Sequence, residues 1–377
     1  MKQIELIATS TFGLEAVVKR EILNLGFEDI QVEDAKITFK GDLSSIPKAN
    51  LWLRSADRVL LKLGDFKALS FEELFEKTKA LPWDEWIPQN GKFTVTGKSV
   101  KSKLFSVPDC QSIVKKAVVE KLKSKYHIDW FEETGPEYTI QVSILKDIAT
   151  LTIDTSGSAL HKRGYRVETV KAPIKETLAA AMIMLSFWNK DRILVDPFCG
   201  SGTIPIEAAM IGKNIAPGLN RSFVSEEWPI LGKDLWKQER VKALKSIDQN
   251  VKLKIYASDI NEKAIDAAKE NAFEAGVDDC IYFETKDFVR FHSPKEYGVI
   301  LCNPPYGERL NEIPEVEQMY KEMGRVFNKV PTWSKYILTS YEDFEKLYGK
   351  KADKKRKLYN GRIKVDYYQY YGPRPSL

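Results

Sequence analysis

The stretch Asp196-Pro197-Phe198-Cys199-Gly200-Ser201-Gly202-Thr203 decides the fold of the C-terminal half of the chain. The apolar run at residues 192–195 predicts a buried parallel strand before it, and residues 204–211 predict a helix with an apolar face after it. A strand, a tight glycine loop and a helix start form the first unit of a dinucleotide-type α/β domain. In such a unit, small residues let the backbone approach a ligand and the helix N-terminus offers free N–H groups.

This loop differs from a plain dinucleotide fingerprint, because it has one Gly-x-Gly with no third glycine in place and Asp196 opens it. An acid at a strand end suits a cationic or hydroxyl-rich ligand, such as the amino acid moiety of S-adenosylmethionine. Downstream, Asn303-Pro304-Pro305-Tyr306 follows the apolar strand predicted at residues 298–302. In this order, each at the C-terminal end of a predicted parallel strand, the two motifs resemble motifs I and IV of class I methyltransferases that act on exocyclic amines of nucleobases.

The chemistry of methyl transfer to such an amine explains why these residue types are needed. The amine is a poor nucleophile because its lone pair is delocalised into the ring. The side-chain carbonyl of Asn303 and the backbone carbonyl of Pro304 can accept its hydrogen bonds and align the lone pair with the methyl group. Pro305 stiffens the turn, and Tyr306 can stack on a base brought out of its helix. We predict that these four residues are catalytic.

The N-terminal part of the chain predicts two small α+β units, the first with ferredoxin-like order. In the second, Lys98, Lys101 and Lys103 lie between a predicted strand and the helix predicted at residues 108–125. They can gather on one phosphate-facing edge, although a solvated face is the alternative. Residues 94–122 resemble a THUMP domain, an RNA-binding module found beside RNA-modifying catalytic domains. The resemblance implies RNA rather than DNA as the partner.

A basic connector, Leu160-His161-Lys162-Arg163-Gly164-Tyr165-Arg166, follows these units. Its cations, glycine and aromatic residue suit phosphate and base contact at a domain junction, with an ordinary basic linker as the alternative. The connector and residues 172–181 resemble the corresponding segments of the bacterial 23S rRNA guanine-N2 methyltransferases, in which the second segment packs beside the cofactor. The predicted RNA-binding residues are Lys98, Lys101, Lys103, His161, Lys162, Arg163, Tyr165 and Arg166.

The other candidates for binding S-adenosylmethionine lie near neighbouring strand ends. Asp259 follows the strand predicted at residues 254–258 and can accept hydrogen bonds from both ribose hydroxyls; it can also cap the next helix, and the two roles are compatible. Asp287 resembles the acid that binds the adenine amino group. The family resemblance implies Lys175, Glu176 and Thr177 as cofactor neighbours, although Glu176 could equally stabilise a helix N-terminus. The predicted set is Lys175, Glu176, Thr177, Asp196, Phe198, Cys199, Gly200, Ser201, Gly202, Thr203, Asp259, Ile260, Asp287 and Phe288.

These patterns predict an α/β chain with a C-terminal Rossmann-like class I methyltransferase domain. Its seven-stranded sheet ends in an antiparallel hairpin, which Asn360-Gly361 predicts, and residues 212–253 form an inserted helical segment. The predicted order is a ferredoxin-like domain (1–65), a THUMP domain (66–158), a basic linker (159–171) and the methyltransferase domain (172–377).

Composition narrows the class of protein further. The chain is 43% hydrophobic and 29% charged with a net charge of +5, and it lacks a signal peptide and a long apolar run. We therefore expect a globular cytoplasmic protein. Its four cysteines show no Cys-x-x-Cys pairing, so we expect neither a metal site nor disulfides. Cys199 and Cys302 are better explained by packing than as nucleophiles.

The sequence thus predicts a methyltransferase that uses S-adenosylmethionine to modify the exocyclic N2 amine of a guanine in RNA. The family resemblance favours 23S rRNA, with tRNA second. Two alternatives stay open. The chain could methylate adenine N6, because Asn-Pro-Pro-Tyr does not select the base, or it could be a non-catalytic RNA-binding or ribosome-assembly factor.

Overall fold

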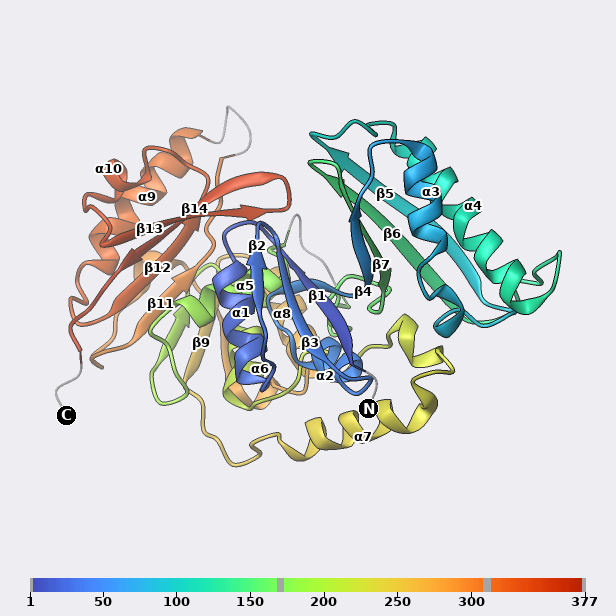
Figure 1. Cartoon of the computed structure of the whole chain (residues 1–377). Helices are drawn as coiled ribbons and strands as arrows, with labels where there is room; N and C mark the ends of the chain where they lie inside the picture. The colour runs from blue at the N-terminus through green and yellow to red at the C-terminus, as the bar shows by residue number, and fades with distance from the viewer. Residues whose placement is uncertain (1–2, 168–172, 308–312, 375–377) are drawn as a thin grey trace.

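The computed structural model describes residues 3–167, 173–307 and 313–374. They form two seven-stranded sheets, each with its own helices (Figure 1). Residues 168–171 of the predicted linker lie outside the described residues, as do positions 1–2 of the predicted ferredoxin-like domain and positions 172, 308–312 and 375–377 of the predicted methyltransferase domain.

The first sheet has the strand order β2-β3-β1-β4-β7-β6-β5. Its strands are β1 (Ile4–Ser10), β2 (Gln31–Glu33), β3 (Lys36–Gly41), β4 (Ala56–Lys67), β5 (Lys92–Val100), β6 (Glu137–Leu145) and β7 (Ile148–Asp154). The long strand β4 pairs with β1 on one side and with β7 on the other, both antiparallel. The predicted domain boundary at residues 65/66 falls inside β4, so the two N-terminal units share one continuous sheet.

The helices on this sheet are α1 (Glu15–Asn24), α2 (Ser45–Trp52), α3 (Phe71–Lys79) and α4 (Val107–Tyr126). Helix α1 buries Val17, Val18 and Ile22 at helical spacing, and it ends just before Gly26, whose φ of 82° is left-handed. Helix α4 packs along α3 and β5 and extends one residue beyond its predicted range at each end.

The second sheet has the order β10-β9-β8-β11-β12-β14-β13. Its strands are β8 (Leu194–Asp196), β9 (Ile255–Asp259), β10 (Ile281–Thr285), β11 (Val299–Cys302), β12 (Ser334–Thr339), β13 (Lys354–Asn360) and β14 (Ile363–Tyr370). The first five strands in this order are parallel, and β14 runs antiparallel to both of its neighbours. The predicted α/β class and terminal hairpin are confirmed. The hairpin turn is Gly361–Arg362, one residue later than predicted, because Asn360 still pairs with Ile363.

Helices cover both faces of the second sheet. On one face, α5 (Glu176–Leu185), α6 (Thr203–Gly212) and α8 (Glu262–Glu274) enclose an apolar core with β8 and β9. On the other face, α9 (Ile313–Phe327) and α10 (Phe344–Tyr348) pack on β11, β12 and β14. No helix of the described residues is long and apolar enough to cross a membrane.

The middle of the inserted segment 212–253 packs on the first sheet, whereas its ends pack on the second. It contains helix α7 (Gly232–Lys245), which runs beneath both halves of the chain (Figure 1). Phe223, Trp228 and Trp236 from this segment belong to the core of the first sheet. Trp228 stacks on Tyr138 of β6 with the ring centroids 4.8 Å apart. The insertion therefore fastens the second sheet's domain to the first.

Candidate active site

The glycine loop joins β8 to α6 at the carboxyl edge of the parallel strands. Gly200 and Gly202 have left-handed φ values of 52° and 85°, which glycine adopts at no steric cost. A Cβ on Gly202 would also lie only 3.0 Å from the Cβ of Ala268 on α8. The Cys199 N–H donates to the Ser258 carbonyl at 3.0 Å, which fixes the loop against the end of β9.

Asp196 lies beneath this loop and is 1% exposed. Its Oδ1 accepts a hydrogen bond from the Phe198 N–H at 3.1 Å, whereas its Oδ2 has no partner among the described residues. Burial raises the pKa of the Asp196 carboxyl well above its usual range, and the carboxylate of Asp259 acts in the same direction. A buried carboxylate oxygen without a partner fits the cationic amino group of a ligand.

Asp259 ties the end of β9 to the glycine loop. Its Oδ2 accepts from the Gly200 N–H at 2.9 Å and its Oδ1 from the Asn261 N–H at 3.0 Å. The alternative role of Asp259 as a helix cap is wrong, because Asn261 is the N-cap of α8 and accepts from the Lys263 N–H. Next to it, the apolar side chain of Ile260 is 74% exposed.

Asp287 and Phe288 follow β10, at the same edge of the sheet. Asp287 caps a short 3-10 helix, accepting from the Val289 N–H at 3.0 Å. The ring of Phe288 packs on that of Phe198 with a centroid separation of 4.8 Å, so two candidate cofactor residues touch. A cavity of about 300 Å³ lies beside Asp287 and Phe288, over β9 and β10.

Arg166 was predicted to bind RNA, but its side chain points inward, toward the glycine loop. Its guanidinium donates to Glu176 Oε1 at 2.9 Å, to Ser201 Oγ at 3.0 Å and to Thr203 Oγ1 at 2.9 Å. Arg166 therefore holds the glycine loop to the start of α5 and does not point outward as a phosphate ligand. Lys175 is the N-cap residue of α5, and Glu176 and Thr177 are buried in its first turn.

Burial corrects the prediction for Arg163 and Tyr165 as well. Arg163 donates to Glu207 Oε1 at 3.3 Å and to the Leu160 carbonyl at 2.7 Å, and it also donates to the Arg54 carbonyl. The Tyr165 hydroxyl donates to Glu207 Oε1 at 3.2 Å. Both side chains are enclosed between the two halves of the chain, so they have no surface to offer RNA.

The remaining predicted RNA ligands are more accessible. His161 is half-buried, and burial followed by the charge of Lys175 lowers its pKa to about 4, so it carries no charge at neutral pH. Lys162 is exposed. Lys98, Lys101 and Lys103 are exposed at one end of β5, where the Lys103 N–H donates to Asp147 Oδ1 at 2.7 Å.

Asn303 follows the last residue of β11, next to β8 in the sheet. Its Oδ1 accepts a hydrogen bond from the Tyr306 hydroxyl. The Tyr320 hydroxyl of α9 donates to the Pro305 carbonyl at 2.8 Å and shares a hydrogen bond with Thr339, which fixes the turn. The structure therefore brings Asn303 and Asp196 to the same edge on adjacent strands.

Sequence reasoning missed Asn271, which lies fully buried on α8. Its Nδ2 donates to the Ser201 carbonyl at 3.0 Å and its Oδ1 accepts from the Val167 N–H at 3.0 Å. It thus joins Val167, which directly follows the connector, to the glycine loop. An asparagine on the apolar face of a predicted helix is a signal that could have identified it.

Cys199 and Cys302 are both buried, and burial raises the pKa of each thiol well above its usual range. A thiol in that state is a poor nucleophile, which favours the packing interpretation. Within the described ranges, no group of three or more histidine, cysteine, aspartate or glutamate side chains could hold a metal ion.

The strand order, the glycine loop and the acids at successive strand ends define a class I methyltransferase. Family models match the chain in three places: an RMKL-like methyltransferase domain at residues 163–369, an RlmL ferredoxin-like domain at 5–60 and a THUMP domain at 68–154. The chain therefore belongs to the RMKL-like family of THUMP-containing class I RNA methyltransferases.

Individual relatives agree with this assignment. The chain is 58% identical over 373 residues to "Putative RNA methyltransferase YpsC" of Bacillus subtilis (strain 168), covering 98% of this chain and 97% of that protein. It is 34% identical over 370 residues to the ribosomal RNA large subunit methyltransferase K/L of Cellvibrio japonicus (strain Ueda107), covering 93% of this chain but 49% of that protein. The structure of SMU.472 complexed with SAH is 48% identical, with a TM-score of 0.94, and each chain is fully covered.

The cofactor is S-adenosylmethionine, and the geometry fits it. The Oδ2 of Asp196, buried beneath the glycine loop without a partner among the described residues, suits the ligand's amino group.

Substituting Asp196 by asparagine should separate stability from cofactor binding. In the cofactor-free protein, the raised pKa means that the fold favours the protonated carboxyl, so stability falls as pH rises above the usual carboxyl range. Asp196→Asn should therefore melt about 2 °C higher than the native protein at pH 8. Its affinity for S-adenosylmethionine should fall at least about tenfold. Melting curves at pH 5 and 8 with calorimetric titration test both, and the exposed Asp191→Asn is the control.

Proposed function

We propose that this protein transfers the methyl group of S-adenosylmethionine to the exocyclic N2 amine of a guanine in ribosomal RNA. The observation that carries methyl transfer to an exocyclic amine is Asn303-Pro304-Pro305-Tyr306 at the end of β11, next to the strand that carries Asp196. The choice of guanine N2 rests on the resemblance to the guanine-N2 methyltransferases. The K/L relative is named for large-subunit ribosomal RNA, which supports rRNA over tRNA. This chain spans about half of that relative, at 49%, so the nucleotide that each one modifies can differ.

The proposed mechanism relies on alignment. S-adenosylmethionine supplies an electrophilic methyl group on a sulfonium. Asp196, Asp259 and the glycine loop between them would hold the cofactor, while Ile260, Asp287 and Phe288 would enclose its adenine. An oxygen that accepts one hydrogen bond keeps a second lone pair, so Asn303 Oδ1 can accept from Tyr306 and from the guanine amine together.

The carbonyl of Pro304 would accept the second N–H of the amine. With both N–H groups held, the nitrogen lone pair points toward the methyl group, which converts binding energy into orientation. No prior deprotonation is needed, because the amine becomes acidic once it is methylated. The ring of Tyr306 would stack on the extruded base.

The first experiment is nucleoside mass spectrometry of rRNA and tRNA from cells with and without the gene. Loss of N2-methylguanosine from rRNA alone is the expected result. Loss from tRNA alone would change the substrate class, and loss of N6-methyladenosine would keep the mechanism but overturn the base. If neither nucleoside changed in either pool, the non-catalytic alternative would take the place of the proposed activity.

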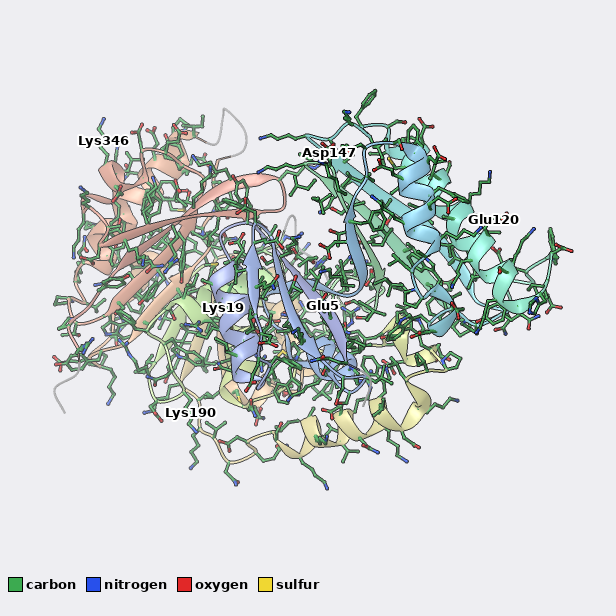
Figure 2. All side chains as sticks on the ribbon, viewed as in Figure 1. Glu5, Lys19, Glu120, Asp147, Lys190 and Lys346 are labelled. Carbon is green, nitrogen blue, oxygen red and sulfur yellow. The ribbon has the colours of Figure 1, made fainter. Side chains whose placement is uncertain are left out.

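The lysines at the end of β5 are proposed as RNA contacts. Asp147, labelled in Figure 2, lies in the turn between β6 and β7 and holds the backbone of Lys103, so this tip is ordered. If Lys98, Lys101 and Lys103 contact phosphates, replacing all three by alanine should reduce the slope of log affinity against log salt concentration by about 2. A binding titration at several salt concentrations measures the slope. The control replaces the exposed α7 residues Lys233, Lys237 and Lys245.

An unchanged slope in the triple variant would show that these lysines form a solvated face and do not contact RNA phosphates. An equal loss in the α7 control would show a general effect of net charge.

A further inference from the structure

The terminal hairpin extends past the catalytic edge of the second sheet. Strand β12 ends at Thr339, which pairs with Asp366 of β14, and Cys302 of β11 pairs with Ile337 of β12. From Asp366 the hairpin continues back along β14 to Ile363 and the turn at Gly361–Arg362. At about 3.4 Å per residue, three further residues carry the turn about 10 Å past the end of β12. The hairpin therefore forms a wall beside Asn303, two strands away.

One face of this wall is basic and aromatic. Lys357 pairs with Asp366 and Tyr359 pairs with Lys364, so Lys357, Tyr359 and Lys364 share a face. The Lys357 ammonium lies 5.7 Å from the centroid of the Tyr359 ring. Both lysines are exposed, as is Arg362 in the turn. The opposite face carries the buried Leu358 and Val365, which fix the orientation of the hairpin.

A second aromatic ring reaches this face from the N-terminal domain. Phe12, in the loop between β1 and α1, is 51% exposed and meets Tyr359 edge-on with the centroids 6.3 Å apart. The next residue, Gly13, has a φ of 92°, and a Cβ there would lie 2.8 Å from the Lys357 carbonyl. The loop is thus fitted closely to the hairpin, and Figure 1 shows the two meeting above α1.

The cations of this face have no acidic partner within the described residues. Asp366, which faces Lys357 across the hairpin, pairs with Lys355 at 3.0 Å, and no ion pair in the described part of the chain involves Lys357, Arg362 or Lys364. Their positive charge is therefore available to a polyanion.

We propose that Phe12 and Tyr359 form a stacking platform for an unpaired nucleotide that flanks the target base, with Lys357, Arg362 and Lys364 binding the adjacent phosphates. Aromatic rings between cations at the rim of a nucleic-acid site are typical of single-strand recognition. The proposal rests on RNA as the substrate. It adds that the RNA is read beside the active site by a surface that two domains build together.

The test measures RNA affinity and methylation separately, using rRNA from cells that lack the gene. Tyr359→Ala should weaken RNA binding and raise the KM for RNA about tenfold, with kcat at saturating RNA unchanged. Tyr359→Phe keeps the ring and should bind like the native protein. Phe12→Ala should act in the same direction. Phe273→Ala, which removes a ring that is 67% exposed on α8, is the matched control and should change nothing.

Native RNA affinity in a folded Phe12→Ala/Tyr359→Ala double variant would overturn the platform. If the alanine variants unfold, Phe12→Leu and Tyr359→Leu replace them in the test, because leucine keeps apolar volume. Native RNA affinity in both leucine variants would also overturn the platform. Failure of the proposed reaction gives a different result: N2-methylguanosine would be absent from the product while RNA affinity still depended on Tyr359.

Discussion

Replacing Asn303 by alanine is expected to lower turnover at least about 30-fold, which corresponds to about 2 kcal/mol of transition-state stabilisation. Asn303 follows β11 directly, and its Oδ1 faces the Tyr306 hydroxyl in the turn that would hold the reacting amine. Alanine removes the acceptor that aligns the amine and leaves the strand intact. Affinity for S-adenosylmethionine should stay native, because the proposed cofactor contacts come from other residues.

A methylation assay beside calorimetric titration of the cofactor measures both quantities. Asn328→Ala, at the exposed end of α9, is the matched control and should keep full activity. Near-native turnover of Asn303→Ala would refute the catalytic role. A parallel loss of cofactor affinity would assign Asn303 to the cofactor site.

Replacing Arg163 by alanine is expected to destabilise the protein by about 3 kcal/mol or more. The side chains of Arg163 and Glu207 are 2% and 0% exposed, so the substitution removes one of the two buried cations beside this carboxylate and leaves only Arg54. It also removes the donors to the carbonyls of Leu160 and Arg54. Because Glu207 belongs to α6, the loss should affect the helix that begins at the glycine loop.

Chemical unfolding with and without S-adenosylmethionine measures this change. The neighbouring Lys162→Ala, which removes an exposed charge, should unfold like the native protein. If Arg163→Ala kept native stability but lost RNA affinity, the original RNA-binding interpretation would be restored.

The strand ends and the glycine loop were predictable because their signals are local. An acid after a short apolar run marks a strand end, glycines before a helix allow a tight loop, and an Asn-Gly between two strands predicts a hairpin to within one residue. Asp196, Asp259, Asp287 and Asn303 accordingly lie at neighbouring strand ends in the second sheet. Their roles toward cofactor and base remain proposals.

The connector was misread because its partners are distant in sequence. Charge and aromaticity are visible in residues 160–166, but burial is not, and Arg163 meets Glu207 of α6 while Arg166 meets Ser201 and Thr203. The same limit hid the packing of Trp228 against Tyr138. The local sequence of a basic residue beside a tyrosine is the same whether the basic side chain faces solvent or a buried glutamate.

The continuous first sheet has a consequence for how a substrate is chosen. Strand β4 runs through both N-terminal units, and the inserted segment around α7 fixes them to the second sheet. Lys98, Lys101 and Lys103 at the end of β5 are thus held at a fixed distance from Asn303. An RNA bound by these lysines would present to Asn303 only the nucleotide that the folded shape of the RNA places at that distance. Under the proposed function, selection by distance would let the protein pass over most guanines without reading the sequence around each of them.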